Sequence, residues 1–124
     1  MVEQFNFNFD YTNPSNHEWV EIMKNKLITA NMFEIHCWSD EDNWTNSALQ
    51  FGTLKETEWT GGKVVFGKIT EEFTNFLLHI PKPLNTDTDY KMTPFFSIFL
   101  DNGFSSEHYG TELHQLGPKF FRKF

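Results

Sequence analysis

The sequence has little cysteine, no long apolar run and few basic residues, and each shortage excludes a class of protein. Its single cysteine, Cys37, cannot form an internal disulfide, which argues against a secreted scaffold held by cross-links. The longest apolar runs, such as the one in FFSIFL, are far shorter than a membrane span, and no signal peptide is recognisable. We therefore expect a cytoplasmic protein that does not enter a membrane.

The charge of the chain is strongly acidic and unevenly spread. There are 17 acidic against 10 basic residues, and the formal net charge is −7. Residues 1–60 hold ten acids and three lysines, whereas KFFRKF at residues 119–124 is basic, and we expect this tail to pack on the acidic body. An acidic body repels phosphate, so we expect no nucleic-acid partner. It attracts basic proteins and speeds encounter with them.

Motifs for cofactors and catalysis are also missing. Gly61-Gly62 is not followed by Lys-Ser or Lys-Thr, so the phosphate-binding loop is absent, and neither GxSxG nor HExxH occurs. One cysteine is too few for the usual thiolate zinc sites. We therefore expect no bound cofactor and no structural metal.

Aromatic side chains, in contrast, are abundant. They make up 18 % of the residues and include 15 Phe, which is enough apolar surface for the core of one domain over 1–124. Strict alternation in QFNFNFDY predicts a half-buried strand over 4–11. MFEIHCW alternates in the same way and predicts a strand over 32–38.

Three segments predict helices. Ser15 followed by Glu18 is a capping-box pattern that opens a helix at about residue 16. Ser39 stands before three acids and predicts the cap of a second helix over 40–51. Thr70 caps a third predicted helix, which ends at the proline of HIP.

The remaining patterns complete an α+β fold. Segments 53–59 and 63–69 flank a glycine pair typical of a hairpin, and 95–101 resembles a buried strand. Residues 81–94 predict a long loop, whereas 104–118 fit either a broken helix or another strand. The order β-α-β-α-β-β-α-β predicts a single-domain sandwich: a mixed, mostly antiparallel sheet of about five strands, with about three helices largely on one face.

The stretch HCWSDEDNW at residues 36–44 gathers the residues that most invite a chemical role. Neighbours on a strand point to opposite faces, so Cys37 joins the core while His36 points away. These two residues therefore cannot form a Cys–His nucleophilic pair, and a buried, inert thiol is the simpler interpretation of Cys37.

Two alternatives to a protein-binding role stay open. A small hydrolase or metal-dependent enzyme would use His36 or the group His108, Glu112 and His114. On a helix His108 and Glu112 share a face, but His114 does not, and a surface loop is the simpler interpretation. An α+β ligand-binding domain is the third hypothesis, and it requires a deep apolar pocket.

Tryptophans beside acids predict a surface that binds a basic protein. Tryptophan and tyrosine are enriched at interface hot spots, and a charged rim speeds docking, although most tryptophans are simply half-buried. The predicted partner-binding patch consists of Trp38, Asp40, Glu41, Asp42, Trp44, Glu56, Glu58 and Trp59, and Asp87, Asp89 and Tyr90 extend it.

In its small size, acidity, aromatic content and lack of catalytic motifs, the chain resembles the immunity proteins that protect bacteria from toxins, including those of contact-dependent growth inhibition systems. The resemblance implies a non-enzymatic protein that neutralises a basic toxin or nuclease by occluding its active cleft. No signature residue supports it, so it transfers no binding position. A nuclease cleft is positive because it holds phosphates, and the barnase–barstar pair is a known example of such complementarity. We expect a monomer, or a weak homodimer paired through an edge strand at QFNFNFDY.

Overall fold

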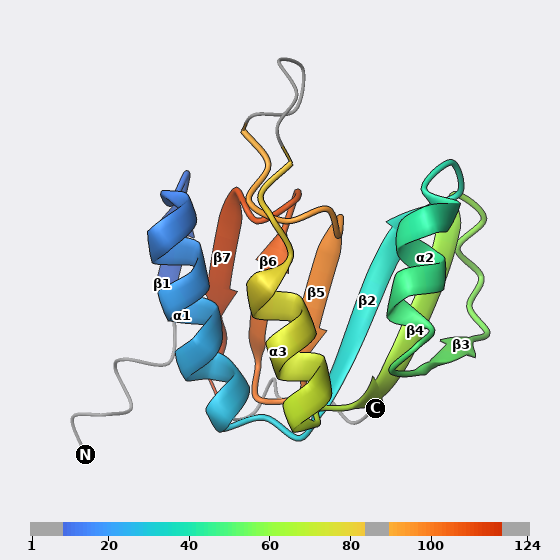
Figure 1. The fold of residues 1–124 in the computed structure, drawn as a ribbon, viewed down its shortest axis with the longest axis horizontal. Coiled ribbons are helices and arrows are strands. Elements are labelled where there is room, and N and C mark those ends of the chain that lie inside the picture. The colour runs from blue at the N-terminus through green and yellow to red at the C-terminus, as the bar shows by residue number, and fades with distance from the viewer. Residues whose placement is uncertain (1–8, 84–89, 118–124) are drawn as a thin grey trace.

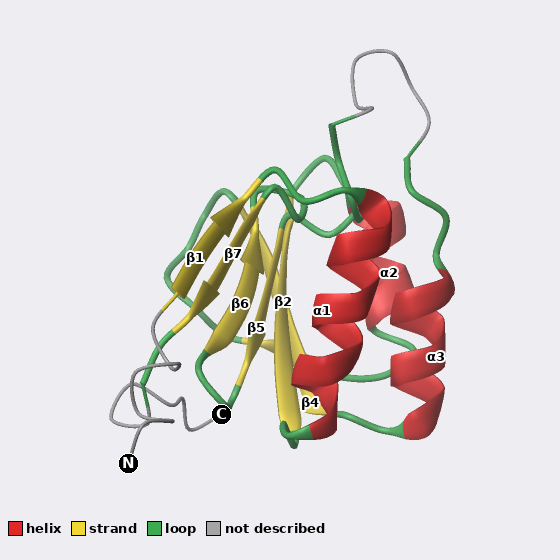
Figure 2. Ribbon diagram, turned by 90° about the vertical axis from the view of Figure 1, so that its left-hand side faces the viewer, coloured by secondary structure: helices red, strands yellow, loops and turns green. Residues whose placement is uncertain are grey.

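The structure, a computed structural model, describes residues 9–83 and 90–117. The three helices of this described part cover one face of a single sheet, as two perpendicular views show (Figures 1 and 2). The fold is α+β, as predicted. The elements in chain order are β1 (Phe9–Thr12), α1 (Asn16–Ile28), β2 (Met32–Trp38), α2 (Asp42–Ala48), β3 (Thr53–Lys55), β4 (Gly62–Lys68), α3 (Glu71–His79), β5 (Ser97–Leu100), β6 (Phe104–Glu107) and β7 (Glu112–Gln115).

Within residues 9–83 and 90–117 the sheet has seven strands, in the order β1-β7-β6-β5-β2-β4-β3. Every neighbouring pair that the structure describes is antiparallel, whereas the sequence predicted a mixed, mostly antiparallel sheet; the number of strands is also higher than the predicted five or so. β2 lies between β5 and β4, with Ile35 opposite Ile98 on one side and Val65 on the other. Central strands of this kind fix the register because one face is buried.

The additional strands come from residues 104–118, which the sequence left ambiguous. They form the β6–β7 hairpin, and the turn between its strands places His108, Tyr109 and Gly110 at φ values of 52°, 61° and 86°. A Cβ on Gly110 would lie 2.8 Å from the indole nitrogen of Trp19, so the position requires glycine for its space as well as its φ. The local sequence is compatible with either a helix or a strand. The pairing of β6 with β5 and of β7 with β1 makes these residues strands.

Helix caps follow the sequence at α1 and α3 but not at α2. Ser15 and Glu18 form the predicted capping box, and the Thr70 hydroxyl accepts a 3.1 Å hydrogen bond from the Phe73 N–H. The predicted cap of the second helix is wrong: Ser39 donates its hydroxyl hydrogen to the Gly61 carbonyl at 2.9 Å instead. α2 therefore begins at Asp42 and ends at Ala48, inside the predicted range 40–51.

The core lies between the helices and the sheet face beneath them. Phe33 of β2 stacks on Phe73 of α3 with ring centroids 3.9 Å apart and planes 5° apart. The Trp19 indole N–H donates a 3.0 Å hydrogen bond to the Ser106 hydroxyl, which ties α1 to β6 in a buried site. Aromatic burial of this kind dominates the stability of small domains.

Several predicted segments are shorter than expected, and some lie outside the described residues. Of the strand predicted over 4–11, β1 supplies the last part, at one edge of the sheet; the rest is outside the described residues. Asp87, Asp89 and the basic tail are outside them as well. Among the helices that the structure describes, none has the length and apolar character needed to span a membrane.

Candidate functional site

β2 divides its side chains between the two faces of the sheet, as its alternation predicts. Phe33, Ile35 and Cys37 are fully buried under the helices. His36 and Trp38 belong to the opposite face, which carries none of the described helices (Figure 2), and both are partly exposed. A functional surface built on β2 must therefore use the residues of this second face.

Cys37 is a buried free thiol, as expected from its place on the strand. Burial raises the pKa of the thiol to about 11, although a hydrogen bond with Thr45 opposes the shift. The thiolate is the nucleophilic form of cysteine, and at neutral pH this thiol stays protonated. Cys37 thus contributes packing rather than chemistry.

Trp38 and Trp59 meet where β2 ends and β4 begins. Their ring centroids lie 5.1 Å apart in an edge-on arrangement, and the Trp38 ring lies 4.8 Å from that of Phe96. Gly61 fits against both indoles, since a Cβ there would approach Trp59 to 2.9 Å and Trp38 to 3.0 Å. The glycine pair that predicts the hairpin therefore also permits the contact of the two tryptophans.

A hollow of about 570 Å³ opens beside Trp38. Tyr109 reaches it from the β6–β7 turn and donates a 2.8 Å hydrogen bond to Oε2 of Glu41. The other carboxylate oxygen of Glu41 accepts a 3.3 Å hydrogen bond from the Trp38 N–H. Glu41 therefore holds two walls of the hollow together. We call this site the Trp38 hollow; its lining is Trp38, Ser39, Asp40, Glu41, Gly61, Lys91 and Tyr109.

The surroundings of Tyr109 in the Trp38 hollow keep its hydroxyl protonated. Burial, followed by the hydrogen bond to Glu41, raises the pKa of Tyr109 far above its ordinary value. Lys91 lies over the same ring, with Nζ 3.8 Å from the centroid, which is a cation–π contact. Asp40 is exposed at this hollow. The site thus combines aromatic rings, two carboxylates and a cation from the chain itself.

The structure brings together part of the predicted partner-binding patch. Trp38, Asp40 and Glu41 line the Trp38 hollow, and Trp59 packs on Trp38. Trp44 is not among them, because α2 turns it toward the helix-covered core, where its ring lies 5.9 Å from that of Phe95. Its part in partner binding stays a prediction, since the ring is only partly buried and does not line the hollow.

The other acids of the predicted patch are exposed but less closely grouped. Asp42 is exposed in the first turn of α2. Glu56 and Glu58 are exposed in the connection between β3 and β4, and Glu58 immediately precedes Trp59. Tyr90 is 53 % exposed and stands next to Lys91. Of these residues, Glu56 lines a shallow hollow together with Trp59.

A buried ion cluster on β2 was missed by the sequence reasoning. Glu34 is only 6 % exposed, and its carboxylate binds His36 Nε2 at 2.8 Å and Lys55 Nζ at 2.7 Å. The hydrogen bond from His36 and the contacts with Lys55 lower the pKa of Glu34 to about 2, against the opposing effect of burial. The sequence does contain a signal for this cluster: the acid Glu34 stands between the apolar residues Phe33 and Ile35 of a predicted strand. His36 is therefore engaged in this cluster.

The group proposed for the enzyme alternative does come together, by a route different from the one expected. Glu112 lies on a strand rather than a helix, so it shares a face with His114, two residues on. Its carboxylate lies 2.8 Å from His108 Nδ1 and 3.5 Å from His114 Nε2, and Asp10 contacts the other nitrogen of His114. Across residues 9–83 and 90–117, no three His, Cys, Asp or Glu side chains are arranged to hold a metal ion.

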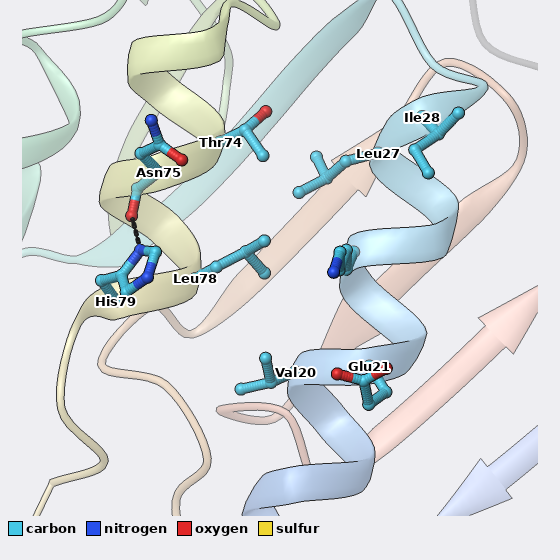
Figure 3. A pocket seen from close by; sticks show the side chains of 9 residues that line it. Val20, Glu21, Leu27, Ile28, Thr74, Asn75, Leu78 and His79 are labelled. Carbon is cyan, nitrogen blue, oxygen red and sulfur yellow. Dashed lines mark hydrogen bonds between the residues drawn. The ribbon is translucent and has the colours of Figure 1, made fainter.

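A second hollow, a groove of about 430 Å³, lies between α1 and α3 on the outer side of the helix layer (Figure 3). Val20, Leu27 and Leu78 give it an apolar part, while Glu21 and Asn75 make other parts polar. Ile28 at its border is 74 % exposed. The groove is therefore open, unlike the deep apolar pocket that a ligand-binding domain requires.

Comparison of the chain with protein-family models, with curated proteins and with solved structures finds no match.

Proposed function

We propose that this chain is a non-enzymatic inhibitor, an immunity protein that neutralises a basic toxin or nuclease in the cytoplasm. The observation that supports the proposal is the Trp38 hollow, which Asp40 lines as an exposed acid, with the exposed Asp42 two residues further along the chain. Aromatic residues anchor protein interfaces, and unpaired surface carboxylates attract a positive cleft. An acidic chain of net charge −7 suits such a partner.

Inhibition would be steric and electrostatic. Exposed carboxylates at the rim steer a basic partner toward the tryptophans, and the bound chain then blocks the partner's cleft. Most of the affinity in such a complex comes from a few well-packed anchors, here Trp38 and Trp59, whose rings pack edge-on. The rim acids act mainly on the association rate.

The test is capture of the partner and inhibition of its activity. The tagged chain is exposed to an extract of its native host, washed at low and then at high salt, and the retained proteins are identified by mass spectrometry. We expect one stoichiometric basic protein that salt releases. The purified partner must then lose its activity on addition of one equivalent of this chain, and retained activity contradicts the proposal.

Asp40→Lys tests the role of the acidic rim. We expect the association rate with the captured partner to fall about tenfold at low salt, with a smaller effect on dissociation, as measured by stopped-flow fluorescence. Glu21→Lys is the matched control, because Glu21 is an exposed acid on α1 and the change in net charge is identical. Equal effects of the two substitutions would show that total charge matters and the rim does not.

The alternative, a small hydrolase or metal-dependent enzyme, is favoured by one observation, the contact of Glu112 with both His108 and His114. Histidine beside carboxylate is a common general acid–base arrangement. Elemental analysis of the purified protein and a hydrolase substrate screen test it. Stoichiometric metal, or turnover lost in His114→Gln, would favour the enzyme over the inhibitor.

A further inference from the structure

We propose that the Trp38 hollow is a binding site for one arginine side chain of the basic protein partner, and that Lys91 occupies part of this site in the free protein. The inference rests on the proposed function and assigns the chemistry of the contact. It starts from the observation that a cation already lies in the hollow: Nζ of Lys91 is 3.8 Å from the centroid of the Tyr109 ring. Cations are attracted to aromatic faces at distances up to about 6 Å.

The backbone explains why Lys91 lies there. The N–H of Met92, the next residue, donates a 2.8 Å hydrogen bond to the carbonyl of Tyr109, and the Thr93 N–H donates to the same oxygen at 3.3 Å. These bonds fix the chain beside the β6–β7 turn. Lys91 is therefore a tethered cation, and its long side chain can leave the ring without any change in the fold.

The walls of the hollow favour a cation through more than charge. Tyr109 donates its hydroxyl hydrogen to Glu41 at 2.8 Å, which pushes electron density into the ring and strengthens its attraction for a cation. Trp38 supplies a second aromatic wall, and indole is the strongest cation–π partner among the side chains. Both rings are held, Trp38 by Phe96 at 4.8 Å and Tyr109 by the same ring at 5.3 Å.

The two carboxylates of the Trp38 hollow differ in their capacity to accept a further hydrogen bond. Both oxygens of Glu41 accept hydrogen bonds, from Tyr109 and from the Trp38 N–H. Asp40 is exposed at the hollow and accepts no hydrogen bond from the described part of the chain. The lining thus holds two carboxylates and one cation, Lys91, so its net charge of −1 favours an incoming cation.

The geometry favours arginine over lysine as the occupant. A guanidinium is planar and weakly hydrated, so it stacks on an aromatic ring while its edge donates two parallel hydrogen bonds to a carboxylate. The hollow offers both partners in one place: the Trp38 and Tyr109 rings for stacking and the Asp40 carboxylate for the edge. Its volume of about 570 Å³ leaves room for a guanidinium group and its stem.

The experiment uses the full chain and peptides instead of the partner. Acetyl-Gly-Arg-Gly-amide is titrated into the ¹⁵N-labelled protein, with the citrulline peptide as a neutral control of the same shape. We expect the arginine peptide to shift the indole signal of Trp38 with a Kd in the millimolar range, roughly 1–10 mM. The citrulline peptide should bind at least about tenfold more weakly. Equal binding of both peptides, or shifts confined to other parts of the chain, would overturn the assignment.

Two substitutions sharpen the test in opposite directions. Lys91→Met removes the tethered cation and should tighten binding of the arginine peptide about threefold, whereas Asp40→Asn should weaken it by a similar factor. Lys24→Met, an exposed lysine on α1, is the control for net charge and should change little. If Lys91→Met leaves affinity unchanged or lowers it, Lys91 does not compete for the site and the proposal is wrong.

The outcome separates this inference from the proposed function. An identified partner that this chain inhibits, with no response of the Trp38 hollow to the arginine peptide, overturns the arginine site and leaves the inhibitor standing. A clear arginine response that Asp40→Asn weakens supports the site even where inhibition of a captured partner fails, and in that case the proposed function is overturned alone.

Discussion

The two faces of the sheet differ in how their side chains are stabilised. Beneath the helices, Phe33 stacks on Phe73 and no charge is needed. On the opposite face the same strand carries Glu34, whose buried carboxylate is held by His36 and Lys55. The first face gains stability from apolar burial, whereas the second keeps polar groups only because each is paired. The comparison shows that a single alternating strand can supply an apolar core on one face and a paired, buried carboxylate on the other.

The largest expected effect tests the apolar face. Phe73→Ala should lower the free energy of unfolding by about 3–5 kcal/mol, because it removes the partner of Phe33 and leaves a cavity. Trp38→Ala on the other face should cost less, about 1–2 kcal/mol, since Trp38 is partly exposed. Urea unfolding of both variants measures the difference. Phe73→Leu is used instead if Phe73→Ala does not fold. An equal loss of unfolding free energy on the two faces would contradict the stated difference between them.

A smaller effect is expected from the buried ion cluster. The pKa of Glu34 is lowered to about 2, so its contribution is present above pH 4.5 and is lost as the pH falls from there through about 2. Glu34→Gln should cost about 1–2 kcal/mol at pH 7, a value reduced for screening because Lys55 is partly exposed. The difference from the unsubstituted protein should shrink toward pH 2.

The control for the ion cluster is Glu21→Gln, which removes an exposed carboxylate on α1. Its unfolding free energy should follow that of the unsubstituted protein at every pH. Should Glu34→Gln keep the acid dependence of the unsubstituted protein, the paired carboxylate is not its source.

The smallest effect has the opposite dependence on pH. Burial lowers the pKa of His114, but its hydrogen bond with Asp10 and the nearby Glu107 and Glu112 outweigh burial and raise it overall. A raised pKa contributes stability below pH 6.5 that is lost as the pH rises through the folded-state value. His114→Gln should therefore remove a few tenths of a kcal/mol of stability at pH 5.5 and almost none at pH 9.

Unfolding curves at these two pH values measure the effect of His114, with His17→Gln on α1 as the control at an exposed histidine. A loss of stability at pH 9 as large as that at pH 5.5 would mean that packing, and not the charge of His114, stabilises this edge of the sheet.

Local sequence features predicted most of the helices and strands, where each feature acts within a few residues. The capping box at Ser15 and the cap at Thr70 are confirmed, since both depend on hydrogen bonds over three residues. The hairpin of 104–118 was not predicted, because its strands exist through pairing with β5 and β1. The false cap at Ser39 has the same origin, a competing hydrogen bond to Gly61, 22 residues away.

The candidate site shows the same division. Alternation in MFEIHCW predicted that Trp38 and His36 leave the core, and the acids beside Trp38 marked the region. The sequence did not reveal that Tyr109 and Lys91 complete the hollow, because both residues follow Trp38 by more than fifty positions. That Trp44 lies outside the hollow could not be predicted either, because the side of α2 that faces the sheet is set by packing.

The sequence by itself determined the α+β class, the caps of α1 and α3, the burial of Cys37 and the acidic character of the surface, since each follows from composition or from a period of a few residues. Tertiary structure alone decided the all-antiparallel order of seven strands, the pairing of Glu34 with Lys55 and the assembly of the Trp38 hollow. These features join residues that are distant in the chain, and only the packing of the whole sheet under its helices brings them within contact distance.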